Sequence, residues 1–290
     1  MSEYSKDYYD YIDAGSLRSA REVVPLVLEL LAPRTVVDVG CGLGAWLSVF
    51  TEHGVEDICG IDGGWVDREA LRFPEERFLA ADLTKRLDIQ REFDLVVSLE
   101  VAEHLPTDAA ADFVSSLTSL GPVILFSAAV PLQGGDGHLN EQWPEYWAAH
   151  FAKHRYVPVD CLRRRIWDND DVDWWYVQNT LFFVKSDAMG EYPKLEKERL
   201  AETSLPLPVI HPRCYVASVQ HGVELQQRVE ELSRWAEDLK DLTPGSGISL
   251  KKVLVSLPRF TMHSIRARLR SWRRRRCASA DSATSDPGWS

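Results

Sequence analysis

The feature that most constrains this chain is a turn that contains three alternate glycines. Residues 36–46 read Val-Val-Asp-Val-Gly-Cys-Gly-Leu-Gly-Ala-Trp, so an apolar stretch typical of a buried strand runs directly into Gly40, Gly42 and Gly44. Because glycine has no Cβ, the main chain can approach a ligand closely there, and open α/β sheets bind ligands at the carboxyl ends of their strands. The turn therefore predicts a ligand site. Gly40, Gly42 and Ala45 also fit the looser dinucleotide pattern, so the motif alone leaves the ligand class open.

Apolar runs and helical patterns alternate along the first part of the chain. The runs are short and are bounded by turn residues, which favours buried strands of a parallel sheet with crossover helices between them. The pattern predicts a doubly wound α/β fold with strands at 35–39, 57–61, 93–99, 122–126, 156–159 and 176–184, and helices at 16–31, 45–53 and 108–120.

Acidic residues mark the ends of successive apolar stretches. The carboxylate of Asp62 can accept hydrogen bonds from both hydroxyls of a ribose. The alternative interpretation is that Asp62 is a solvated loop residue or a helix cap. Asp82 can accept from an adenine amino group, or it can cap the next turn through Thr84. Asp38 lies on a buried strand, so it must pair with the amides of the glycine turn or with a ligand, and we favour the amides. Cys41 is expected to be a small packed side chain.

These residues together resemble the class I S-adenosylmethionine-dependent methyltransferases. That superfamily carries acidic residues before a G-x-G-x-G turn, at the end of the next strand, after the third strand and at the start of a later strand; here they are Asp38, Asp62, Asp82 and Asp94. Segment 93–105, with its Glu-His pair, resembles the branch that modifies small molecules, and it lacks the Asn/Asp-Pro-Pro-aromatic tetrad of DNA adenine methylases. The resemblance implies a seven-stranded, mostly parallel, Rossmann-like sheet whose last strand is antiparallel.

The resemblance also implies that S-adenosylmethionine lies across the glycine turn. Its expected contacts are Asp38, Gly40, Cys41, Gly42, Gly44, Asp62, Asp82, Leu83, Leu99 and Glu100. Two other functions remain as alternatives. A nicotinamide-dependent oxidoreductase shares the glycine turn, but the sequence shows no convincing Tyr/Lys pair for hydride transfer. A catalytically silent adaptor that organises a membrane-proximal complex would have no physical reason to retain the whole cofactor motif.

Polar residues on a glycine-rich loop, at 127–143, follow the strand expected at 122–126. Methyl transfer from a sulfonium depends mainly on alignment, and a base is needed only when the acceptor atom starts protonated, as a hydroxyl does. A histidine can titrate near neutral pH, so His138 is our first choice for a general base, with a positioning role as the alternative. Glu141 is the second candidate, with helix capping as its alternative. We expect His104 to pack or hydrogen-bond locally more readily than to act as a catalyst.

Aromatic and amide side chains gather after this loop. Five of the ten tryptophans fall between residues 143 and 175, and aromatic faces beside amides suit a sugar ring, although core packing explains them equally well. The stretches 134–143 and 173–179 resemble a bacterial subgroup of methyltransferases linked to polysaccharide or secondary-metabolite genes. We therefore expect a hydroxyl of a saccharide-like acceptor, including a sugar or sugar nucleotide, bound by Asn140, Gln142, Trp143, Trp175 and Gln178.

The composition changes after the expected last strand. The sequence predicts a methyltransferase domain at 1–186, a proline-rich linker at 187–218, a helix at 219–242 and a basic, partly disordered tail at 243–290. Apolar residues spaced by four and three along 219–242 fit a short coiled coil, which would provide self-association. Arginines around an apolar face at 251–276 fit a helix on an anionic membrane surface.

The charge distribution restricts the partners. The chain has a net charge of −11; residues 251–290 carry 10 basic and 2 acidic side chains, which leaves 23 basic and 42 acidic residues in 1–250. An acidic body repels phosphate backbones, so we expect no nucleic-acid substrate. The five cysteines form no CxxC pair and no zinc-type cluster, so we expect no metal site and no disulfide framework. No leader or membrane span is apparent, and we expect a cytoplasmic protein with peripheral contact at the inner membrane face.

Overall fold

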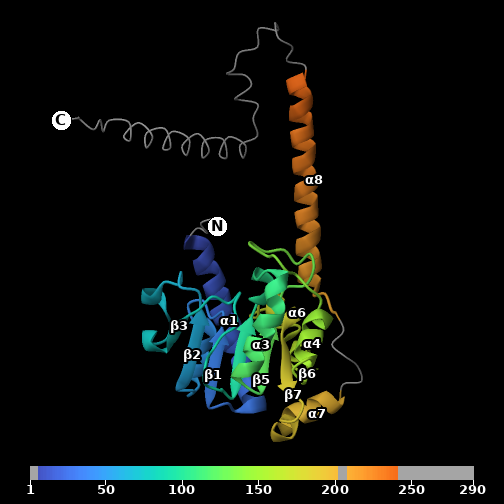
Figure 1. The fold of residues 1–290 in the computed structure, drawn as a ribbon. Helices are drawn as coiled ribbons and strands as arrows, with labels where there is room; N and C mark the ends of the chain where they lie inside the picture. Colours follow the sequence, from blue (N-terminus) through green and yellow to red (C-terminus); the bar gives the residue numbers. More distant parts are fainter. Residues whose placement is uncertain (1–5, 202–207, 241–290) are drawn as a thin grey trace, which may run out of the picture. The chain divides into compact units, whose positions relative to one another are not determined.

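A computed structural model describes residues 6–201 and 208–240 of the chain, and within them the strands form one seven-stranded sheet between helices (Figure 1). The strands are β1 Thr35–Val39, β2 Asp57–Asp62, β3 Phe78–Ala80, β4 Leu95–Leu99, β5 Val123–Ser127, β6 Tyr156–Val159 and β7 Leu181–Lys185. The α-helices are α1 Lys6–Leu31, α2 Ala45–Glu52, α3 Ala110–Leu120, α4 Pro144–Ala152, α5 Arg163–Ile166, α6 Trp174–Asn179, α7 Pro193–Ala201 and α8 Pro212–Lys240. Short 3₁₀ turns lie between them, among them η3 at Ala102–His104.

The strand order is β3-β2-β1-β4-β5-β7-β6, and every pair is parallel except those of β7 with β5 and β6. The expected doubly wound sheet with an antiparallel last strand is therefore confirmed. The pairing sets Val39 beside Ile61 and Leu99 beside Ser127, so β1, β2, β4 and β5 end at the same edge. The loops that follow these four strands can therefore form one site.

Helices cover the sheet through two apolar clusters. One cluster joins α1 and α2 to the sheet, with Val27 and Phe50 fully buried; the other joins α3 and α4, with Phe113, Trp147 and Phe151 buried. Each fully buried large side chain contributes about 1.5–3 kcal/mol to stability. The strands between the clusters are apolar on both sides, and this is why their residues read as continuous runs.

The expected strand at 176–184 is wrong in its first half. Trp174–Asn179 forms α6, and only Leu181–Lys185 is extended. Tyr176 and Val177 are as deeply buried as the residues of β7, and a buried helix turn and a buried strand give the same apolar run.

The expected linker at 187–218 also differs from the structure. Helix α7 packs on the domain: Leu195 is fully buried in the core, and Arg165 pairs with Glu198 at 2.7 Å. Helix α8 begins within the expected linker, at Pro212. The chain divides into a unit of residues 1–218 and a unit of residues 219–290, and the expected tail at 243–290 lies outside the described residues. No helix in the described ranges combines the length and apolar character needed to cross a membrane.

Candidate active site

The glycine turn after β1 has the geometry that its sequence predicts. Gly40, Gly42 and Gly44 have φ angles of +86°, +53° and +85°, which lie in the left-handed region that favours glycine. A Cβ on Gly44 would lie 2.2 Å from the ring of Phe73. The amide of Gly40 donates to the carbonyl oxygen of Ile61 at 2.7 Å. The turn is therefore fastened to the end of β2.

Asp62 organises this turn. Its carboxylate accepts hydrogen bonds from the amides of Gly42 at 2.8 Å and Gly63 at 2.6 Å. Burial raises the pKa of Asp62, and these two hydrogen bonds oppose the rise. We expected Asp38 to bind the turn amides, but the structure gives that role to Asp62 and Ile61, because these residues lie on the strand beside the turn.

Asp38 is buried, and its Oδ2 atom has no hydrogen-bond partner among the described residues. Burial and the nearby charge of Asp62 raise the pKa of Asp38 to about 8. A cationic group beside this oxygen would remove the cost of leaving it unpaired. Cys41 is buried and its pKa is raised, mainly by burial, so it behaves as a packed side chain rather than a nucleophile.

Asp82 makes the turn-capping contacts that the sequence offered as an alternative. Its carboxylate accepts hydrogen bonds from Thr84 Oγ1 at 2.6 Å and from the Thr84 amide at 3.1 Å, and Lys85 lies at 3.1 Å. The hydrogen bonds from Thr84 and Lys85 lower the pKa of Asp82 to about 2. Leu83 and Leu99 are buried. Contacts of Asp82 with adenine stay a prediction.

Glu100 lies at the centre of a buried polar network. It has a left-handed φ of +54°, and its carboxylate accepts hydrogen bonds from Asn179 at 3.0 Å and Gln133 at 2.9 Å. Burial raises its pKa, and these two hydrogen bonds oppose the rise. Gln178, which we expected to bind substrate, is 1% exposed and accepts a hydrogen bond from the His211 amide at 2.8 Å. It therefore holds the residues before α8 against α6. Gln133 and Asn179 were not predicted as site residues, and their only signal in the sequence was their position within the segments 127–143 and 173–179.

His138 and Glu141 form a hydrogen-bonded pair on the loop after β5. Nδ1 of His138 lies 2.8 Å from Oε1 of Glu141, and the Glu141 carboxylate also accepts the amides of Leu132 at 2.8 Å and Gly134 at 2.9 Å. Both side chains are mostly buried, with exposed fractions of 12% and 20%. Glu141 therefore orients the imidazole instead of capping α4.

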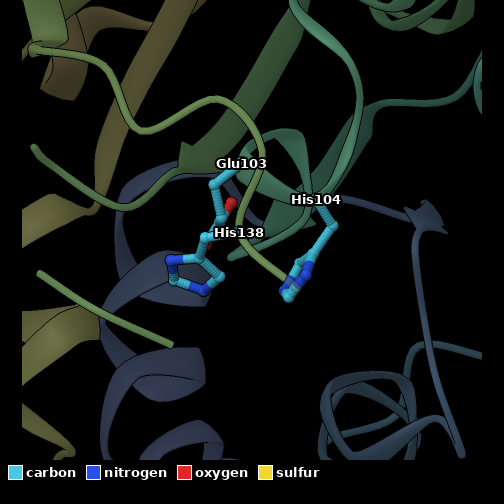
Figure 2. Close-up of side chains that lie close together, drawn as sticks. All are labelled: Glu103, His104 and His138. Atoms are coloured by element: carbon cyan, nitrogen blue, oxygen red, sulfur yellow. The ribbon is translucent and has the colours of Figure 1, made fainter. Parts of the chain in front are cut away.

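The ring of His104 approaches the ring of His138 edge-on, with centroids 4.8 Å apart. Burial and the neighbouring His138 lower the pKa of His104. Figure 2 shows both histidines beside Glu103, which precedes His104 in η3. The structure thus brings His104, His138 and Glu141 together, and their catalytic roles stay predictions.

The expected acceptor-binding residues have mixed environments. Asn140 is buried, and its Oδ1 accepts hydrogen bonds from Thr107 at 3.1 Å and Gln142 at 2.9 Å. Trp143 is 41% exposed, whereas Trp175 is partly buried against the core. Trp143 is therefore more available to an acceptor than the buried Asn140, and Gln142 and Trp175 have intermediate exposure.

Comparison with known proteins identifies the family. A family model described as a methyltransferase domain matches residues 11–170. The chain belongs to this methyltransferase family. No curated protein matches this methyltransferase.

Solved structures share its fold. The sugar N-methyltransferase KedS8 from a Streptoalloteichus species is 18% identical, with a TM-score of 0.50, over 64% of this chain and 94% of that one. DesVI from Streptomyces venezuelae is 16% identical, with a TM-score of 0.48, over 63% and 99%. The methyltransferase domain of a bacterial CtHen1 is 19% identical, with a TM-score of 0.42, over 58% and 98%. At these identities the likeness concerns the fold.

The methyltransferase uses S-adenosylmethionine, and its residues fit that cofactor. The cofactor carries a cationic sulfonium and an ammonium group, and the buried, unpartnered oxygen of Asp38 is complementary to such charge. The three left-handed glycines leave the main chain of the turn open to close approach. The Asp62 oxygens have lone pairs beyond those used by the two amides, so ribose hydroxyls can donate to them.

Proposed function

We propose that this methyltransferase methylates a hydroxyl group of a small, saccharide-like acceptor. The observation that carries the proposal is the hydrogen bond between His138 and Glu141, on a loop at the same sheet edge as the glycine turn. A histidine oriented by a carboxylate is a common arrangement for taking a proton from a hydroxyl. The acceptor class is further supported by the exposed Trp143 beside Gln142.

Each group of residues in the site has a separate role in this reaction. Asp38, Asp62 and the glycine turn bind the cofactor, which supplies a methyl group on a positively charged sulfur. His138 donates Nδ1–H to Glu141, and this leaves Nε2 with a lone pair for the acceptor proton. The acceptor oxygen forms a bond to the methyl carbon as the carbon–sulfur bond breaks, and the proton of the hydroxyl passes to His138. Alignment of these atoms provides most of the rate enhancement.

The first test is binding of S-adenosylhomocysteine and of NAD to the whole protein, measured by calorimetry. We expect the protein to bind S-adenosylhomocysteine and not NAD. Binding of NAD alone would indicate an oxidoreductase. Binding of neither compound, with no thermal stabilisation by S-adenosylhomocysteine, would favour the silent adaptor.

The second test is methyl transfer from labelled S-adenosylmethionine to pools of sugars, sugar nucleotides and other metabolites. We expect label in a saccharide-like product. His138→Ala should lower turnover and leave affinity for S-adenosylhomocysteine unchanged, whereas His221→Ala, at an exposed position of α8, should change neither turnover nor affinity. Full turnover by His138→Ala would remove His138 from the reaction.

We also propose that residues 219–242 mediate self-association and that residues 251–276 bring a cytoplasmic enzyme to an anionic membrane surface. The first proposal is supported by the exposure of Leu225, Val229 and Leu232 on α8, at 49%, 61% and 41%. The second rests on the arginines of a segment outside the described residues.

A further inference from the structure

Three potential metal ligands lie together beside the carboxyl end of β4. Glu103 and His104 come from η3, and His138 comes from the loop after β5 (Figure 2). One ligand atom from each lies within 4.8 Å of the other two. The ligands of one ion with bonds of about 2.2 Å lie at most about 4.4 Å apart, so side-chain movements of a few tenths of an ångström would bring the three atoms to the separation that one ion requires.

Glu103 provides an independent sign of a bound cation. It is fully buried, and neither of its carboxylate oxygens has a hydrogen-bond partner among the residues that the structure describes. A second buried carboxylate, Glu100, adds unfavourable charge. Burying an unpaired carboxylate costs free energy, and a cation would offset that cost.

His138 is arranged as metal-binding histidines usually are. Such a histidine donates its other ring N–H to a carboxylate, which fixes the tautomer and increases the basicity of the ligand nitrogen. Here Nδ1 pairs with Glu141 at 2.8 Å, so Nε2 is the free nitrogen. A Cβ on Gly135 would lie 2.2 Å from Nε2, so glycine at this position keeps the nitrogen accessible.

The loop and η3 are fixed relative to one another. The amides of Leu139 and Asn140 donate to the carbonyl oxygen of Glu103 at 2.7 Å and 2.9 Å. The residue that follows His138 is therefore attached to the residue that supplies the carboxylate, and the main chain holds these two ligands near one another.

We propose that Glu103, His104 and His138 bind a divalent first-row transition metal ion. Two imidazoles and one carboxylate suit Mn²⁺, Fe²⁺, Co²⁺ or Zn²⁺, whereas Mg²⁺ and Ca²⁺ prefer oxygen ligands. Three protein ligands leave coordination positions open, and one of the three ligands, His104, is exposed to solvent. This site could not be predicted from the sequence, because His138 is distant in the chain from the Glu-His pair.

The ion would change the role of His138, and this consequence rests on the proposed function. When Nε2 binds the ion, it cannot accept a proton. An acceptor hydroxyl bound at an open position would instead lose its proton more readily, because coordination to a cation lowers the pKa of a bound hydroxyl. The proton would leave to solvent and the oxygen would then attack the methyl carbon.

The test is titration of the EDTA-treated, full-length protein with Co²⁺ and with Mn²⁺, without methyl donor or acceptor, by calorimetry and, for Co²⁺, by visible absorption. We expect one site per chain. Glu103→Gln, His104→Gln and His138→Gln should each abolish the site, and Glu141→Gln should weaken it about 10–100-fold. Gly135→Ala, which changes no ligand, should weaken it as well. The matched control is His221→Gln on α8.

Loss of the site in the three ligand variants, with His221→Gln unchanged and all variants still binding S-adenosylhomocysteine, would support the proposal. Equal metal binding by the wild type and the ligand variants, or no binding by the wild type, would overturn it. Thermal unfolding of each variant distinguishes a lost ligand from a lost fold. The metal titration contains neither methyl donor nor methyl acceptor. Its result therefore does not depend on whether the proposed methyl transfer takes place.

Discussion

Asp38 and Asp62 lie near the same glycine turn, but they have different environments. Asp62 accepts hydrogen bonds from two amides of the protein, whereas Oδ2 of Asp38 has no partner in the described part of the chain. Asp62 thus stabilises the turn, and one oxygen of Asp38 is left available to a cationic group. The sequence predicted both residues as cofactor contacts, but it could not say which one fastens the turn, because that depends on the register of β1 and β2.

Cofactor affinity should depend on pH through Asp38. Its pKa of about 8 in the free protein means that it is mainly protonated at neutral pH. The positive charges of S-adenosylmethionine favour the ionised form, so binding lowers this pKa and releases a proton. We expect affinity to rise with pH up to about 8 and then level off. Calorimetry over this range, in buffers of different ionisation enthalpy, measures both effects. A flat profile, or one unchanged by Asp38→Asn, would contradict the assignment.

Removal of the Asp62 carboxylate should weaken cofactor binding. Asp62→Ala takes away the acceptor of the Gly42 and Gly63 amides as well as the expected ribose contact. Hydrogen bonds to a charged group contribute about 1.5–3 kcal/mol, and we expect a loss of that size for S-adenosylhomocysteine, measured by calorimetry. The control is Asp112→Ala at an exposed position of α3. Unchanged affinity in Asp62→Ala would exclude its role.

At the scale of elements, strands were predicted better than helices. Residues 35–39 and 156–159 form strands with the expected bounds, because short apolar runs between turn residues have few other structures available. The 176–184 run was misassigned because burial on all sides removes periodicity. The cluster of Glu103, His104 and His138 could not be predicted, because it forms only when the loop after β5 attaches to η3.

The three glycines of the turn should differ in their tolerance of alanine. A Cβ on Gly40 would meet the side chain of Val101 at 2.3 Å, and one on Gly44 would meet Phe73 at 2.2 Å, whereas Gly42 has nothing within 4 Å. Gly42→Ala should therefore cost only the left-handed conformation, about 1–2 kcal/mol, and the other two should cost more. Chemical denaturation of the three variants gives the order. A larger loss for Gly42→Ala than for Gly40→Ala would contradict this geometry.

Helix α8 should associate with a second copy through its apolar stripe. Leu225→Lys with Val229→Lys places charge on that stripe and should shift sedimentation velocity profiles toward the monomer. Gln220→Lys with Gln227→Lys adds the same charge at exposed positions away from the stripe and should not. Equal profiles for the two double variants would exclude this interface.

At the scale of the whole molecule, charge is distributed unevenly along the chain. The acidic residues concentrate in 1–250 and the arginines in 251–290. Binding to anionic vesicles should therefore depend on the tail and weaken as salt increases, since exposed charges are screened. Co-sedimentation with vesicles, with and without residues 251–290, measures this. If the protein without residues 251–290 binds vesicles as well as the full chain does, the tail is not the membrane-binding segment.

The amides of Leu139 and Asn140 attach the loop after β5 to the carbonyl oxygen of Glu103, next to His138. The side chain of Leu132, on the same loop, is 84% exposed, while its main-chain amide donates to Glu141. A substitution that changes only this outward-facing side chain can therefore leave the main-chain contacts of the His138–Glu141 pair in place. We expect related enzymes to differ in the molecules they accept through such surface side chains while their chemistry stays the same.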